Sequence, residues 1–215
     1  MVIRFLFPIL CLVWMGSCTA QDAAQGAPLL KYFQQSPSTG TLHLELPADD
    51  EKPIPGDTIP NLLFFRTLGK MLQEVDYIAD STSCTIVGRQ RFALNQTYDA
   101  CLVEITLSWF KHQSLLLYNK QKHRFTERIT VAEWYGGDGG QVLTGSWLID
   151  HDGDQQQDLV RRVIEHWIVG AESDQAIEKS KESVELLRWK NGHFVKTPIR
   201  DSAALIRKYP IRSVW

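Results

Sequence analysis

The 215-residue chain lacks an excess of charge of either sign, with 23 Lys and Arg against 25 Asp and Glu and a formal net charge of -2. A protein that binds a nucleic-acid backbone needs clustered positive charge, and no basic stripe runs along this sequence. We therefore predict no nucleic-acid partner. With 44% hydrophobic residues, the composition is that of a globular protein rather than a disordered or collagen-like chain.

Several catalytic signatures are also missing. No GxSxG surrounds Ser146, and no GxxxxGK[ST] or GxGxxG loop occurs, which leaves the nucleophilic-serine and nucleotide-binding classes without support. The histidines are scattered singly, without HExxH or His-x-His spacing, so zinc catalysis has no local support either. Glycoside hydrolysis stays open, because its two carboxylates, for example Glu104 and Glu133, are defined by their separation in space.

Long hydrophobic runs are absent after the first 15 residues. Arg4 precedes the apolar run 5–15, which is too short to span a bilayer, since a span needs about 20 apolar residues. We interpret residues 1–17 as a cleaved signal peptide. The ending Met15-Gly16-Ser17-Cys18 resembles a bacterial lipobox, which implies lipidation of Cys18 and an anchor in a cell-envelope membrane. Ordinary secretory cleavage after Ala20 is the alternative, and either route exports the protein.

Cysteine is scarce, with four residues in the whole chain. Cys11 leaves with the signal peptide, Cys18 is the predicted lipid site, and Cys84 and Cys101 remain in the body. Two cysteines in an oxidising compartment most simply form a disulfide. Closing a loop of about 18 residues would stabilise the fold by roughly 3 kcal/mol. A reactive thiol paired with a histidine is the alternative, and it has no local signature.

The chain divides into three parts by composition. After the signal peptide, residues 18–59 are rich in Ala, Gln, Ser, Pro and Asp and are predicted to be a tether and irregular lead-in, with a short strand over 41–46. Residues 60–215 are predicted to form one domain. Its first element is a helix over 61–78, because apolar residues recur at helical spacing after Pro60.

After Asp80, short runs rich in Val, Ile, Thr and aromatic residues alternate with turn residues, which is typical of β-rich domains. We predict a mainly β fold, α+β overall, in which the helix precedes an antiparallel β-meander closed as a sandwich or an incomplete propeller-like sheet. The predicted hairpin connectors are Asn119-Lys120, the glycine-rich loop 136–140 and Asn191-Gly192. The predicted strands are 84–92, 100–110, 114–118, 125–134, 142–149, 159–169, 184–190 and 194–197.

One of these segments is ambiguous. Val160, Val163, Ile164 and Trp167 also have helical spacing, so a helix over 158–169 is the alternative; the β context on both sides favours a strand. The polar stretch 171–183 that follows is predicted to be a surface loop. A last helix is predicted over 202–208, with Asp201 as its cap.

The most informative constellation is Asp150-His151-Asp152-Gly153-Asp154-Gln155-Gln156-Gln157-Asp158. Its carboxylates converge on one point when the chain folds into a tight loop, and they repel unless a hard cation such as calcium neutralises them. Gln155 stands where an EF-hand has Gly, and Arg161 where it has Glu, which argues against a helix-loop-helix sensor. A polar turn whose Asp side chains hydrogen-bond their own backbone is the alternative.

The acidic loop resembles the DxDGDxxxDL loops of FG-GAP/VCBS-type repeats, which join β-strands in calcium-binding extracellular domains. The resemblance covers about a dozen residues, and no second copy or blade-length repeat is present. It implies that calcium is bound by Asp150, Asp152, Asp154 and Asp158, with the backbone carbonyl of Gln156 as a further ligand. We expect the ion to be structural, fixing the two flanking strands.

Six tryptophans follow the signal peptide. Carbohydrate-binding surfaces use such rings, but aromatic residues in strands are more often core, and the core is our prediction. Taken together, the sequence predicts an exported envelope lipoprotein with a binding or structural role, a membrane contact through its anchor, and an unidentified protein or glycan ligand. An envelope hydrolase acting on glycan or peptide is the alternative.

Overall fold

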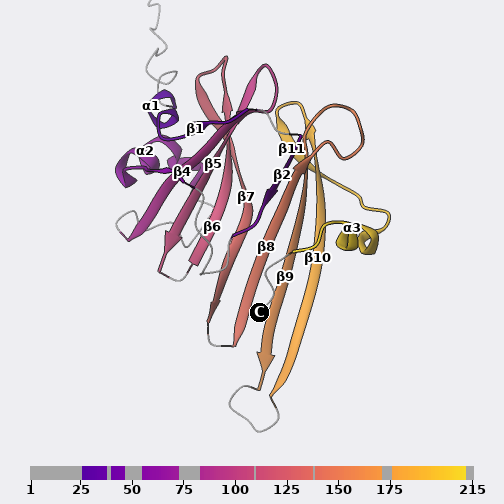
Figure 1. Ribbon diagram of the computed structural model, residues 1–215. Coiled ribbons are helices and arrows are strands. Elements are labelled where there is room, and N and C mark those ends of the chain that lie inside the picture. Colours follow the sequence, from indigo (N-terminus) through magenta and orange to yellow (C-terminus); the bar gives the residue numbers. More distant parts are fainter. Residues whose placement is uncertain are drawn as a thin grey trace, which may run out of the picture.

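The computed structural model describes residues 26–37, 40–46, 55–72, 83–108, 110–137, 139–170 and 176–211. Within these residues the chain is mostly strand, with a few short helices (Figure 1). The elements, in chain order, are α1 (Ala27–Leu30), β1 (Gln34–Gln35), β2 (Thr41–Leu44), β3 (Asp57–Thr58), α2 (Asn61–Leu72), β4 (Cys84–Ala93), β5 (Tyr98–Leu107), β6 (Phe110–Asn119), β7 (Arg124–Gly137), β8 (Gly140–Ile149), β9 (Asp158–Val169), β10 (Ile177–Lys190), β11 (His193–Thr197) and α3 (Ser202–Lys208).

The strands form one sheet of 11 strands, and from β4 to β11 each strand pairs with the next in the chain. These ladders are antiparallel, whereas the short β1 runs parallel to β4. The mainly β class and the antiparallel meander are therefore confirmed. The sheet stays open, because its order runs from β1 to β11 without a ladder that joins the two ends.

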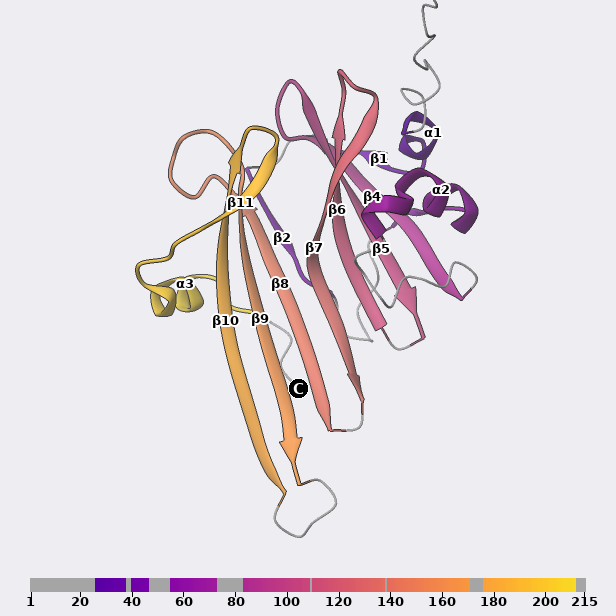
Figure 2. The same ribbon diagram turned by 180° about the vertical axis from the view of Figure 1, so that it is seen from behind.

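The sheet divides where β7 meets β8. These strands pair only from Glu133 to Gly137 on β7, opposite Gly140 to Thr144 on β8. Beyond that point β2 takes the place beside β8, with Thr41 opposite Ile149. Figures 1 and 2 both show β2 lying between β7 and β8. The short strand predicted over 41–46 is thus confirmed over Thr41–Leu44.

The apolar side chains pack in three clusters. The first lies between the helices α1 and α2 and one face of β4–β7, and it includes Leu29, Phe64, Leu68, Ile86, Val103 and Leu116. The second joins residues of β4–β7 to β2, β8, β9 and β11, and it includes Leu44, Leu102, Leu115, Leu117, Leu148, Leu159 and Phe194. The third packs β8–β10 against the C-terminal segment that carries α3, and it includes Trp147, Val160, Leu186 and Tyr209.

The segment predicted to be a tether and lead-in belongs in part to this folded body. Leu29, Phe33, Leu44 and Ile59 are all buried in the core. Four short elements, α1 and β1–β3, come from residues 27–58. The prediction missed α1, β1 and β3 because each is too short to show a periodic pattern. The predicted signal peptide and Cys18 lie outside the described residues.

The predicted helix after Pro60 is confirmed over Asn61–Leu72. Its burial follows the expected spacing, since Phe64 and Leu68 are fully buried while Leu62 faces solvent. The Asn61 side-chain amide donates a hydrogen bond to the Cys84 carbonyl at 2.8 Å, which ties the first turn to β4. The rest of the predicted helix, 73–78, lies outside the described residues.

The ambiguous segment 158–169 is a strand, paired on both sides with β8 and β10. The surface loop predicted over 171–183 is wrong from Ile177 onward, because β10 begins there and pairs with β9 from Ile177 to Leu187. Residues 177–183 are exposed on both faces. A strand without a buried face has no alternation of apolar residues, so its sequence is hard to distinguish from a polar loop.

The predicted strand 100–110 is in fact interrupted by a turn. β5 ends at Leu107 and β6 begins at Phe110, with Ser108 in the left-handed region at φ 53°. No glycine or proline marks this turn, which is why the sequence pattern did not reveal it. The Asn191-Gly192 turn is confirmed, with φ of 51° and 88° as a type I′ hairpin requires. Asp201 caps α3 by accepting from Ala204 N at 2.9 Å, also as predicted.

The predicted Cys84–Cys101 disulfide is wrong. Both residues are buried in the first core cluster, and neither is in a disulfide. Cys84 lies opposite Leu107 in the β4–β5 ladder, six positions along β5 from Cys101. That offset is roughly 20 Å at the rise of a strand, and a disulfide needs Cα atoms about 4.4–6.8 Å apart.

Candidate metal centre

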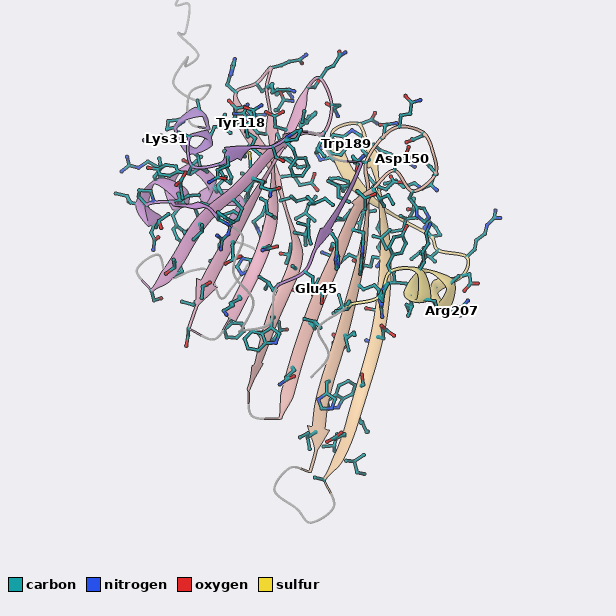
Figure 3. All side chains as sticks on the ribbon, viewed as in Figure 1. Lys31, Glu45, Tyr118, Asp150, Trp189 and Arg207 are labelled. Carbon is teal, nitrogen blue, oxygen red and sulfur yellow. The ribbon has the colours of Figure 1, made fainter. Side chains whose placement is uncertain are left out.

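The acidic loop joins two paired strands at one end of the sheet. Ile149, the last residue of β8, lies directly opposite Asp158, the first residue of β9. The loop must therefore reverse the chain between two fixed points. Figure 3 shows Asp150 at the same end of the sheet as Trp189 on β10.

Asp150 organises the turn. Its carboxylate accepts hydrogen bonds from the backbone N–H of Gly153 at 2.7 Å and of Gln155 at 3.0 Å. Gly153 and Gln155 both have positive φ, 83° and 66°, so the chain curls back on itself twice. Asn, Asp and Gly tolerate this left-handed conformation best, and Gln155 is an unusual residue in it.

The curl brings three carboxylates together. Asp150, Asp152 and Asp154 each offer an oxygen, and these oxygens all lie within 4.8 Å of one another. Arg188 on β10 partly balances their charge, with Nη1 at 2.6 Å from Asp152 Oδ2. Three of the predicted metal ligands therefore meet around one point, although a loop of this kind also forms where Asp side chains hold only their own backbone.

Asp158 differs from the other three, because it is 3% exposed. Its Oδ1 accepts one long hydrogen bond from Trp189 N at 3.4 Å, and its Oδ2 is buried without a hydrogen-bond partner. Burial raises the pKa of Asp158, and the negative charges of Asp152 and Asp154 raise it further. A buried carboxylate oxygen without a partner is costly, so the hydrogen bonds of the loop do not explain Asp158; the same holds for the neighbouring Gln157, whose Oε1 is also buried without a partner.

Gln156 supports Asp154. Its backbone N–H donates to Asp154 Oδ1 at 2.8 Å, and its side-chain amide donates to Oδ2 at 3.1 Å. The prediction assigned the Gln156 carbonyl as a ligand. His151 points elsewhere: its Nδ1 lies 3.1 Å from the Tyr209 hydroxyl, near the end of α3. It is half-buried.

The donor set is chemically uniform. It consists of carboxylate oxygens, with neither thiolate nor imidazole among them, and such a set suits calcium, which takes six to eight oxygen ligands. Asp158 lies beside Asp152 and Asp154 closely enough for their charges to affect its titration. The group of carboxylates within 4.8 Å of one another consists of Asp150, Asp152 and Asp154, and Asp158 is not part of it.

The carboxylates weighed for glycoside hydrolysis each have their own partners. Glu104 accepts from Arg89 Nη2 at 2.7 Å and from Gln113 Nε2 at 3.0 Å. Glu133 accepts from Thr144 Oγ1 at 3.2 Å. Both side chains are thus engaged in hydrogen bonds within the sheet.

The tryptophans differ in their surroundings. Trp147 is buried in the third core cluster, and Trp189 packs beside the second, as predicted. Trp167 instead lines a surface hollow at the far end of β9 from the acidic loop. Trp109 and Trp215 lie outside the described residues.

The chain matches no protein-family model, and its comparison with curated proteins and with solved structures finds no match. None of the helices in the described part of the chain is long and apolar enough to cross a membrane.

Proposed function

We propose that this protein is an exported bacterial envelope lipoprotein, anchored through Cys18, whose β-rich body is stabilised by calcium and serves a binding or structural role. Calcium would be held by Asp150, Asp152, Asp154 and Asp158, with the Gln156 carbonyl as a further ligand. The anchor rests on the lipobox-like residues before Cys18.

The observation that carries the calcium site is the Asp158 carboxylate. Its Oδ2 is buried, lacks a hydrogen-bond partner, and lies among the charges of Asp152 and Asp154. A cation at this point would satisfy the orphaned oxygen and remove the repulsion at once. A purely structural turn gives no reason to bury a fourth carboxylate.

The role of the ion follows from the position of its ligands. Asp150 follows the last residue of β8, Asp158 begins β9, and Asp158 also accepts from Trp189 N on β10. Calcium here would join the ends of three neighbouring strands. Extracellular calcium modules bind with Kd of about 10⁻⁴–10⁻³ M, which suits a compartment rich in this ion.

The test is thermal unfolding of the purified protein in EDTA and in about 10 mM calcium. A site in this affinity range would stabilise the fold by about 2 kcal/mol, which raises the Tm by about 4–8 °C for a protein of this size. Asp152→Ala is expected to abolish the rise.

Asp158→Asn distinguishes loss of calcium binding from loss of stability better than Asp152→Ala does. It removes the unpaired charge, so the Tm in EDTA is expected to stay constant or increase, while the calcium-dependent rise is lost. Asp57→Ala, which removes an exposed carboxylate of β3 far along the chain, is the matched control and should keep the full rise. A wild-type Tm that does not respond to calcium would refute the site.

A further inference from the structure

The lower ends of β7–β10 form an arm that extends beyond the core clusters. In Figures 1 and 2 the ends of β9 and β10 extend past the rest of the sheet. Residues 177–183 of β10 are exposed on both faces. The arm begins where β7 and β8 pair, and β8 runs from there to the acidic loop, a length of about 30 Å.

One face of the arm carries a row of large side chains. Tyr135 lies opposite Val142, which lies opposite Glu165, so these three share a face. The Phe110 ring extends the row, with its centroid 5.1 Å from that of Tyr135. Trp167 is two residues beyond Glu165 and therefore lies on the same face.

The next residues on this face are glycines, which leave the backbone uncovered. Gly137 lies opposite Gly140, which lies opposite Trp167. A Cβ built on Gly137 would meet no atom within 4 Å, and one on Gly140 would meet only the His166 carbonyl, at 3.7 Å. The glycines thus leave open space between the rings of Phe110 and Tyr135 on one side and Trp167 on the other.

This space is a hollow of about 580 Å³, lined by both sets of rings and floored by the glycine backbone. Its volume lies within the range of small-ligand sites. Glycine weakens a strand, and glycine inside a strand often marks a place where a ligand or another backbone approaches closely. The side chains that line the hollow, Phe110, Tyr135, Val142 and Trp167, are half-buried, so part of each is exposed to solvent.

The charge at the hollow is balanced. Glu165, on its wall, lies 3.8 Å from Lys181 on β10, and both side chains are exposed. Neither an anion nor a cation is favoured by such a pair, whereas a neutral ligand with hydroxyl groups finds both an acceptor and a donor there. The hollow therefore complements a neutral polar molecule with flat apolar faces.

We infer that the hollow binds a neutral carbohydrate chain, with sugar rings stacked between Tyr135 and Trp167 over the backbone of Gly137 and Gly140. A sugar ring has an apolar face for an aromatic wall and hydroxyls at its rim for Glu165 and Lys181. A protein partner would need about 800 Å² of matched surface on each side, and the mixed charges beyond the rings do not offer it. This inference names a ligand for the proposed binding role and rests on that role, but not on the calcium loop.

The test is isothermal titration calorimetry of the full exported protein with neutral hexasaccharides: cellohexaose, xylohexaose, laminarihexaose and chitohexaose. We expect at least one to bind with a Kd below about 1 mM. Trp167→Ala removes one wall and is expected to weaken binding by about tenfold, the order of one aromatic stacking contact. Gly137→Leu fills the hollow without meeting an atom at its Cβ, and it should abolish binding while the Tm is kept.

Trp134→Ala is the matched control. Trp134 precedes Tyr135 on β7 and therefore points to the opposite face, so the same loss of an indole should leave the Kd within about twofold. The inference is overturned if none of the hexasaccharides binds, or if Trp167→Ala and Gly137→Leu bind as the wild type does. It is also overturned if the protein is a dimer that these variants convert to a monomer. Sugar titrations in EDTA and in calcium test this inference separately from the calcium proposal. If the sugars do not bind, the calcium site is unaffected, and if calcium does not bind, sugar binding is unaffected.

Discussion

Arg188 Nη1 lies 2.6 Å from Asp152 Oδ2, so a guanidinium of β10 already neutralises part of the acidic loop. A calcium ion bound by Asp152 would meet this positive charge at close range. Arg188 therefore has two opposite effects. It stabilises the acidic loop when no ion is bound, and it lowers the affinity of the loop for calcium.

Arg188→Gln is expected to raise calcium affinity about tenfold, because one repelling positive charge near the site is removed. The Tm in EDTA should fall, since the acidic side chains lose their counter-charge. Calorimetric titration with calcium measures the first effect and thermal unfolding the second. Lys196→Gln on β11, where Lys196 pairs with Glu185, is the control and should leave the affinity within about twofold. An unchanged affinity in Arg188→Gln would argue against Asp152 as a ligand.

His112 makes stability depend on pH. It is 3% exposed on β6, and burial lowers its pKa from 6.5 to about 4, helped by the positive charge of Arg128. The unfolded chain binds this proton below about pH 6.5, whereas the folded protein does so only below about pH 4. Stability is therefore full above pH 6.5 and falls by about 3 kcal/mol as the pH drops to 4. Urea unfolding at several pH values between these limits measures the slope.

His112→Gln removes this proton and should flatten the slope between pH 6.5 and 4, whatever it does to the stability at pH 7. His123→Gln, at the exposed β6–β7 turn, serves as the control and should keep the wild-type slope. The same slope in wild type and His112→Gln would show that other groups cause the acid sensitivity.

The two buried cysteines are expected to be unreactive in the native protein. Burial raises the pKa of the Cys101 thiol, which suppresses the reactive thiolate. Ellman's reagent should therefore modify neither Cys84 nor Cys101 until guanidinium unfolds the chain, and then both. A reductant should leave the Tm unchanged. A Tm that falls in dithiothreitol would indicate a disulfide and would contradict the strand register.

Gly192 is expected to be the least replaceable glycine of the hairpin turns. Its φ is +88°, and an added Cβ would lie 2.5 Å from the Tyr98 hydroxyl. Gly139 has almost the same φ, +89°, but a Cβ there would meet only Ile168, at 3.7 Å. Gly139→Ala should thus cost about 1 kcal/mol from the backbone alone, and Gly192→Ala at least about 1 kcal/mol more. Equal losses of unfolding free energy would contradict the steric contribution of Tyr98.

The strands that could be predicted are those with at least one buried face. β4, β6 and β8 carry Val, Ile, Leu and aromatic residues between turn signals, and the Asn191-Gly192 hairpin and the Asp201 cap are local features that need no tertiary contact. The first half of β10 could not be predicted, because it has no buried face to impose a pattern. β1 and β3 could not either, since two residues carry no period.

The disulfide prediction rested on two cysteines in an expected oxidising compartment, and it took no account of where they lie in the sheet. Cys84 and Cys101 lie on the neighbouring strands β4 and β5. Their register depends on where the turn falls, at residues 94–97, and that position places them at different heights along the ladder. The acidic loop was predictable because its spacing is local, whereas the burial of Asp158 and the contact of Arg188 depend on β10.

The hollow on the arm could not be predicted from the sequence either. Each of its residues is ordinary in sequence: a glycine-rich loop predicted to be a hairpin connector, and tryptophans predicted to be core. The cross-strand register alone brings Tyr135, Gly140 and Trp167 onto one face. Three strands must be aligned before that juxtaposition exists, and sequence patterning within one strand does not supply the alignment.

The pairing of β2 with β8 sets the order in which the chain can fold. Residues 41–44 are synthesised about 100 residues before their partners 146–149, whereas β4 to β11 each find the preceding strand next to them. Contacts between distant segments form late, because closing a long loop costs more entropy than closing a hairpin. The meander can therefore assemble as successive hairpins, and β2 docks last, completing the second core cluster through Leu44. Until then the four residues of β2 stay unpaired, and so short a strand offers little edge for a neighbouring chain to join.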